Sequence, residues 1–113
     1  QITPHLLISE IRTIASDDLW LSPCYRQASV AIHFTWKPDW PAVQKLLPLI
    51  EKSLAPFDAR PHWAKLFTMP PERVTSLYSK LPDFRILAKK FDPHGKFRNE
   101  FVDKYIFGDR SHI

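Results

Sequence analysis

Basic and aromatic side chains gather in the stretch from Arg60 to Phe67. Pro61 has no backbone N–H and a fixed φ, so it marks the start of a new segment. The residues after it are typical of a short extended run, in which Trp63, Lys65 and Phe67 would share one face. Lys65 is then either a surface lysine lying along two rings or a cation placed to bind a ligand oxygen. The usual exposure of lysine favours the surface interpretation for this stretch alone.

A carboxylate and a guanidinium lie two residues apart in the first predicted strand, Leu6–Thr13. Alternation places Glu10 and Arg12 on one face, together with Leu6 and Ile8. Such a pair is commonly a surface ion pair of little energetic weight. The functional alternative is a fixed acceptor beside a fixed donor fork, which suits a polyhydroxylated or anionic ligand.

The second predicted strand, from Ser29 to Trp36, alternates cleanly between two kinds of residue. One face is large and apolar and the other is small or polar, so a ligand would have room above the second. His33 and Thr35 lie on that second face. Each is common in strands for structural reasons, and their shared face is what makes them candidates. The apolar face consists of Val30, Ile32, Phe34 and Trp36.

Helices are expected to cover this sheet. Asp39 is a plausible N-cap for a helix running to Leu54, which Pro48 should kink or split. Its apolar residues recur at helical spacing and leave Glu51 outside. Pro70-Pro71 opens a second short helix. The third begins near Pro82 and should turn Phe84, Leu87 and Phe91 inward; after a turn at residues 92–95, Phe97 and Phe101 should anchor the last segment.

The predicted fold class is α+β, an antiparallel or mixed sheet covered by helices. The 113 residues suit a single domain spanning 1–113, and a chain that begins with Gln1, almost inside a strand, is interpreted as a fragment of a larger cap domain. No stretch is apolar and long enough to cross a bilayer. The single cysteine, Cys24, excludes an internal disulfide and is compatible with a reducing compartment, so we expect a cytoplasmic protein.

Several kinds of site are disfavoured by what the sequence lacks. Only 2 glycines occur, and no glycine-rich loop could cradle a nucleotide phosphate. We expect no metal site, because no two histidines have ligand spacing. The histidines are His5, His33, His62, His94 and His112.

Four stretches of the sequence recur together in one known family: Ser9-Glu10-Ile11-Arg12-Thr13, Asp17-Asp18-Leu19-Trp20-Leu21-Ser22-Pro23, Arg60-Pro61-His62-Trp63-Ala64-Lys65 and Asp92-Pro93-His94-Gly95-Lys96-Phe97-Arg98-Asn99. Together they resemble the FAD-linked sugar-alcohol and aldonolactone oxidases of the vanillyl-alcohol oxidase type. They occur in the family's order and cover nearly the whole chain from about Ser9. His33-Phe34-Thr35-Trp36-Lys37 is more similar to the alditol (xylitol) oxidases than to the gulonolactone or arabinonolactone oxidases.

The resemblance implies the C-terminal part of a substrate-binding cap domain, without the FAD-binding domain of the same polypeptide. It implies that Arg12 and Lys65 hold the reacting oxygen while a hydride leaves the adjacent carbon for the flavin. It implies that Glu10 and Thr35 bind further hydroxyls of a polyol substrate, and that His33 lines the same pocket. FAD would be held mainly by the missing domain; which residues of this chain touch it is unknown.

Three other interpretations stay open. The chain could be the cap of an aldonolactone oxidase, or a structural domain with a vestigial pocket. It could also be a stand-alone module for carbohydrate or nucleic acid, which the 16 basic residues against 12 acids, the pI near 9.4 and the 4 tryptophans would favour. Against nucleic acid, Trp36 falls on the apolar strand face, and the basic residues near the C-terminus are interleaved with acids. We therefore expect neither a nucleic-acid nor a membrane partner.

Overall fold

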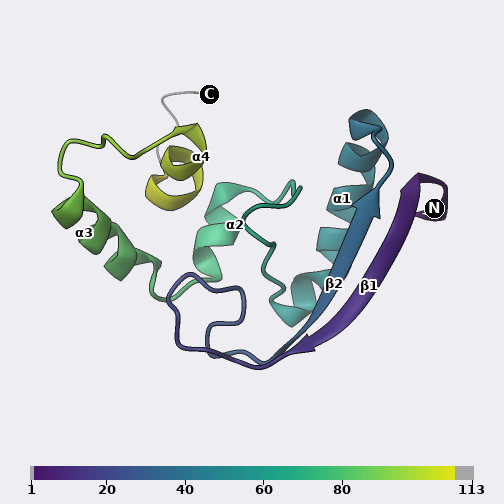
Figure 1. The fold of residues 1–113 in the computed structure, drawn as a ribbon, viewed down its shortest axis with the longest axis horizontal. Coiled ribbons are helices and arrows are strands. Elements are labelled where there is room, and N and C mark those ends of the chain that lie inside the picture. Colours follow the sequence, from purple (N-terminus) through teal and green to yellow (C-terminus); the bar gives the residue numbers. More distant parts are fainter. Residues whose placement is uncertain (1, 109–113) are drawn as a thin grey trace. The chain divides into compact units, whose positions relative to one another are not determined.

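The two strands form an antiparallel ribbon, β1 (Leu6–Ile14) and β2 (Ser29–Trp36), which run side by side in Figure 1. The computed structural model describes residues 2–108, so the His112 side chain lies outside the described part. Helices accompany the ribbon, and the α+β prediction is confirmed. Within the described residues, none of the helices combines the length and apolar character that a bilayer crossing needs.

The described chain separates into two compact units. The first comprises residues up to Asp18 and Ser22–Met69; the second comprises Leu19–Leu21 and the part from Pro70 onward. The first holds the ribbon, helix α1 (Trp40–Leu54) and a 3₁₀ turn at Ala55–Phe57. The second holds α2 (Pro71–Ser76), α3 (Leu81–Phe91), α4 (Glu100–Val102) and a π-helical turn at Asp103–Phe107.

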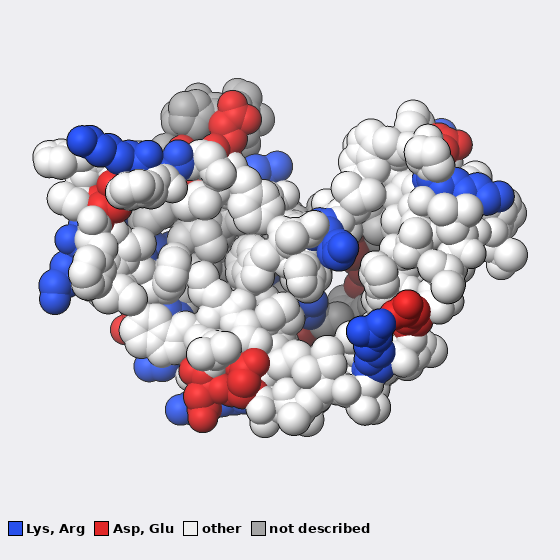
Figure 2. Space-filling model, viewed as in Figure 1, with Lys and Arg blue, Asp and Glu red and all other residues white. Residues whose placement is uncertain are grey.

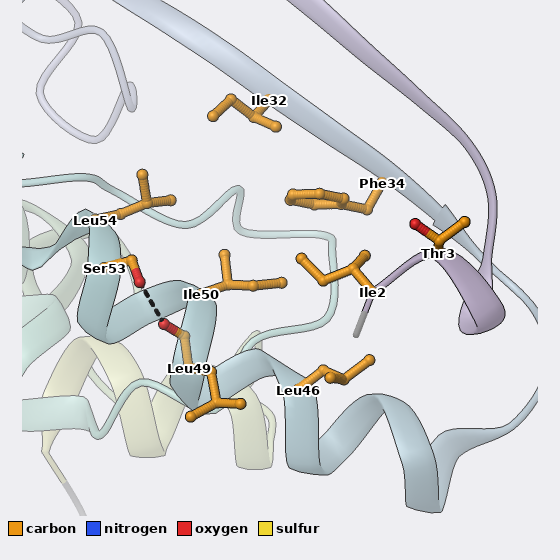
Figure 3. A pocket seen from close by; sticks show the side chains of 9 residues that line it. All are labelled: Ile2, Thr3, Ile32, Phe34, Leu46, Leu49, Ile50, Ser53 and Leu54. Atoms are coloured by element: carbon orange, nitrogen blue, oxygen red, sulfur yellow. Dashed lines mark hydrogen bonds between the residues drawn. The ribbon is translucent and has the colours of Figure 1, made fainter.

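Helix α1 lies on the side of the ribbon that carries Ile32 and Phe34 (Figure 3). Asp39 caps its N-terminus by accepting a 3.3 Å hydrogen bond from the Ala42 N–H, as predicted. The helix continues through Pro48 as one element, so the predicted split does not occur. Glu51 was predicted to lie on the outer side of the helix, but it is half-buried and bonded to Thr68. Its carboxylate accepts from the Thr68 N–H at 2.6 Å and from the Thr68 hydroxyl at 2.8 Å.

The second unit buries a small core of its own side chains: Val74, Leu77, Tyr78, Leu81 and Ile106. Asp92 stabilises the turn after α3 by accepting from the N–H groups of Lys96 (2.8 Å) and Phe97 (3.0 Å). Asn99 then caps α4 by accepting from the Val102 N–H at 2.9 Å. The stretch from Asp92 to Asn99 is therefore a folding signal for two consecutive turns.

The predicted inward face of α3 is wrong in part. Leu87 is 41% exposed and Phe91 is 75% exposed, while Phe84 is half-buried. Phe97 is 86% exposed and cannot anchor the last segment. The Phe101 ring contacts the Tyr105 ring in a tilted arrangement, with ring centroids 4.9 Å apart and an interplanar angle of 45°. The 3.6-residue period correctly gave the helix, but periodicity does not say whether an apolar stripe finds a partner within the same chain.

Candidate functional site

The strand register brings four predicted site residues onto one face of the ribbon. Glu10 lies opposite His33, Ile8 lies opposite Thr35, and Arg12 lies opposite Ala31. Residues directly opposite each other in an antiparallel pair point to the same side. The polar face, as we call the side carrying Glu10, Arg12, His33 and Thr35, is therefore formed as the alternation predicted.

A register shift changes one neighbour of this face. Leu6 pairs with Trp36 although Ile8 pairs with Thr35, so a bulge lies between Leu6 and Ile8. Leu6 consequently belongs with Trp36 on the apolar side, and its predicted place beside Ile8 is wrong. An inserted residue in one strand reverses the alternation, which strict period-2 reasoning cannot anticipate.

Glu10 and Arg12 form an ion pair on the polar face. Arg12 Nη2 donates to Glu10 Oε2 at 2.5 Å, and the two side chains are 39% and 71% exposed for Glu10 and Arg12 respectively. An exposed pair of this kind contributes little to stability. The arrangement nevertheless holds a guanidinium, which has further donors, next to a carboxylate whose second oxygen can accept from a ligand.

The opposite face of the ribbon is apolar and turns toward α1. Ile32 and Phe34 of β2 point at Leu46 and Ile50 of the helix, as Figure 3 shows. Between them lies an open pocket of about 610 Å³, also lined by Ile2, Thr3, Leu49, Ser53 and Leu54. The Ser53 hydroxyl is used within the helix, donating to the Leu49 carbonyl at 3.0 Å. Because α1 occupies this side, the polar face is directed away from the helix.

Lys65 does not lie in a strand, and the predicted extended run is wrong. Residues 63–64 form a turn: the Lys65 N–H donates to the His62 carbonyl at 3.0 Å, and the Ala64 N–H donates to His62 Nδ1 at 3.1 Å. A side chain that bonds the backbone two residues on favours a turn over a strand. Trp63, Lys65 and Phe67 therefore do not share a strand face, and Lys65 is exposed in the same compact unit as the ribbon.

The turn that carries Lys65 is held on both sides. On one side, Arg60 Nη1 donates to the carbonyls of Pro23 (3.2 Å) and Tyr25 (2.9 Å), and Tyr25 is buried. On the other side, Thr68 is bonded to Glu51 of α1. Sequence reasoning did not predict this structural role of Arg60. The only sequence signals for it were a basic residue directly before Pro61 and a separate loop that contains a proline.

The Pro23 loop is itself ordered by Asp17. The Asp17 carboxylate accepts from the Ser22 hydroxyl at 2.6 Å, and the backbone N–H of Arg26 donates to the Asp17 carbonyl at 2.8 Å. The Cys24 N–H donates to the Ser22 hydroxyl oxygen at 3.1 Å. Two of the four family-like stretches thus meet through Arg60 and serve to place the Lys65 turn.

The charged and metal-ligating side chains of residues 2–108 are spread over the surface. Among residues 2–108, no group of three or more His, Cys, Asp or Glu side chains is arranged to hold a metal ion. In the view of Figure 2, lysine and arginine side chains are interspersed with aspartate and glutamate rather than gathered in one stripe. A continuous basic track is what single-stranded nucleic acid would need.

Comparison with known proteins agrees with the resemblance. The model of the D-arabinono-1,4-lactone oxidase family matches residues 5–105. An alditol oxidase of a Streptomyces species is 42% identical over 107 residues, 95% of this chain and 26% of its own length. L-gulonolactone oxidase from Scyliorhinus torazame is 31% identical over 101 residues, 87% of this chain and 23% of its own length. A long-chain alcohol oxidase from an uncultured marine euryarchaeote matches over 53 residues at 36% identity, 47% of this chain and 11% of its own length.

The chain thus spans about a quarter of the length of the curated alditol and gulonolactone oxidases it matches. The matched region includes both strands of the ribbon, the Lys65 turn and the Asp92–Asn99 turns. Since the family model covers most of the chain, this chain belongs to the D-arabinono-1,4-lactone oxidase family.

Proposed function

We propose that this chain is the C-terminal substrate-binding part of an FAD-dependent oxidase that oxidises the terminal CH–OH of alditols such as xylitol and sorbitol, with O₂ as acceptor. The observation that carries the proposal is the polar face, where Glu10, Arg12, His33 and Thr35 are set side by side by the strand register. The 42% identity to an alditol oxidase over 95% of the chain supports this substrate class.

The proposed roles follow from the charge that develops during oxidation. Oxidation of an alcohol moves negative charge onto oxygen, and a fixed cation stabilises that charge most in the transition state. Arg12 and Lys65 supply cations for this task, and His33 is the third catalytic candidate. Glu10 accepts from one hydroxyl of the polyol, and Thr35 donates to or accepts from another. Lys65 sits on a turn held by Arg60 and by the Thr68–Glu51 bonds, which suits a placed cation.

We propose that the flavin's phosphates are bound mainly by residues outside this chain. Both glycines, Gly95 and Gly108, have φ near +68° and lie in turns of the second unit, not between a strand and a following helix. A phosphate cradle needs such a strand–helix junction. We therefore assign FAD binding to a part of the polypeptide outside this chain, and propose that the isolated chain has no oxidase activity.

An aldonolactone oxidase cap is the second candidate, and the 31% identity to an L-gulonolactone oxidase favours it. A linear polyol presents a row of hydroxyls, whereas a lactone replaces one donor by an ester that only accepts. An unpaired buried partner costs about 1–3 kcal/mol, so a face with both acceptor and donor groups favours the polyol. A stand-alone carbohydrate or nucleic-acid module is the remaining alternative. A cytoplasmic location is part of our proposal, and the free, buried Cys24 is compatible with it.

A steady-state comparison on the full-length protein tests the proposal. The reading frame upstream should encode a flavin domain, and the purified protein should oxidise xylitol with a higher kcat/KM than gulonolactone. A higher kcat/KM for the lactone would move the assignment to the aldonolactone oxidases. An upstream frame without a flavin domain would favour the stand-alone module.

A further inference from the structure

We propose that Glu10 sets the charge selectivity of the polar face, so that neutral polyols bind and sugar acids are rejected. The inference rests on the proposed function, because it takes Arg12 as the group that meets the substrate. It assigns Glu10 a repulsive role in addition to hydroxyl binding.

Glu10 is already paired with the Arg12 guanidinium, which is the group that an anionic ligand would bind. Arg12 Nη2 is 2.5 Å from Glu10 Oε2, and both side chains rise from the same face of one strand. The residue opposite Arg12 in the register is Ala31, which brings no charge. A carboxylate that binds Arg12 must therefore displace Glu10 or sit beside it, and two carboxylates on one guanidinium repel each other.

A neutral polyol meets no such penalty. Its hydroxyls can donate to the second oxygen of Glu10 and accept from the remaining N–H groups of Arg12 at the same time. A carboxylate only accepts hydrogen bonds, so it gains nothing from Glu10. Discrimination between partners commonly depends on a repulsive group of this kind as well as on attractive contacts.

The Glu10–Arg12 ion pair is not needed for the stability of the fold. Glu10 and Arg12 are more than one-third exposed, and exposed pairs contribute little to stability. Neutralising Glu10 should therefore leave the ribbon folded and change mainly which ligands Arg12 accepts.

The test uses the full-length protein, with xylitol as the neutral ligand and xylonate as the acid of the same carbon number. The quantity measured is the inhibition constant of xylonate divided by the KM for xylitol. Glu10→Gln should lower this ratio about tenfold, equivalent to about 1.4 kcal/mol. Where a variant turns over too slowly, the two dissociation constants from calorimetry give the corresponding ratio.

Two control variants separate charge from geometry. Glu10→Asp keeps the negative charge but shortens the side chain, so its ratio should stay near that of the wild type. Asp18→Asn removes the same charge from another exposed pair, Asp18 with Arg26 at 3.5 Å in the loop, and should also leave the ratio unchanged.

An unchanged ratio in Glu10→Gln, or an equal fall in Asp18→Asn, would overturn the inference while leaving polyol oxidation in place. If the wild-type protein neither oxidises nor binds xylitol, the proposed function fails first and this inference fails with it. The wild-type measurement therefore tells the two failures apart.

Discussion

Arg60 and Lys65 lie five residues apart in one stretch, and the structure predicts opposite consequences for replacing them. Arg60 is half-buried and donates to two backbone carbonyls, at 3.2 Å to Pro23 and 2.9 Å to Tyr25. Lys65 is exposed on the turn that Arg60 supports. Arg60→Met should therefore reduce stability, and Lys65→Met should reduce turnover.

The magnitude for Arg60 follows from its two bonds. Hydrogen bonds to a charged group contribute about 1.5–3 kcal/mol each, and two bonds from one guanidinium nitrogen add up to less than twice that. We expect Arg60→Met to lower the free energy of unfolding by about 2–4 kcal/mol. Arg60→Lys should restore only part of it, because an ammonium does not hold its N–H groups in the fixed plane of the guanidinium. Lys65→Met, a surface change, should alter stability by no more than about 0.5 kcal/mol.

Urea unfolding of the full-length protein, followed by tryptophan fluorescence, measures the stability arm, and xylitol turnover per folded molecule measures the other. Loss of one charge-stabilising donor typically costs about 2.7–4 kcal/mol of transition-state stabilisation, so Lys65→Met should lower kcat by about 10²–10³. The reasoning would be refuted if Arg60→Met unfolded at the wild-type urea concentration. Near-wild-type turnover of Lys65→Met would return Lys65 to a surface lysine with no role in the reaction.

Three further outcomes are expected. Thr35→Val should raise the KM for xylitol, because a hydroxyl partner on the polar face is lost, while the maximal rate of flavin reduction stays near wild type; pre-steady-state absorbance measures both, and a nearly silent variant would favour a lactone substrate. The isolated 113-residue chain should bind no FAD tightly, and a stoichiometric flavin absorbance spectrum in a purified sample would contradict this. Gly95→Ala should destabilise the turn after α3 by about 1–2 kcal/mol, since φ is +68° there and an added Cβ would lie 3.3 Å from Arg98 Cδ; an unchanged unfolding midpoint would count against it.

The polar face was predictable because it depends on local alternation alone. Glu10 and Arg12 in one strand and His33 and Thr35 in the other are each two residues apart, and period 2 fixes a common face within each strand. Whether the Glu10 face of β1 and the His33 face of β2 lie on the same side of the ribbon depends on the strand register, which a local sequence pattern does not determine. Here the apolar face of β2 is turned toward α1, with Ile32 and Phe34 lining the same pocket as Leu46 and Ile50, and this arrangement favours the observed register.

The Lys65 stretch shows where the same reasoning fails. Alternating aromatic and polar residues resembled a strand, but His62 bonds the Ala64 N–H with its own ring and closes a turn. Such a bond competes with strand pairing, and propensity alone does not weigh it. The long-range ties through Arg60 and Glu51 are separated by 35 and 17 residues from their partners, beyond any local pattern.

Several apolar residues of the ribbon and of α3 also show the limit of local sequence patterns. Leu7, Ile11 and Val30 on the ribbon are more than 60% exposed, as are Ile86 and Phe91 on α3. Alternation and periodicity placed Val30 and Phe91 on inward faces, because such patterns report what a segment would bury and not whether its partner belongs to the same 113 residues. A two-stranded ribbon is marginal without further packing. Together with a match to only about a quarter of the alditol oxidase, this exposure argues that the polar face gains its full shape, and Lys65 its final neighbours, in the longer protein that we propose.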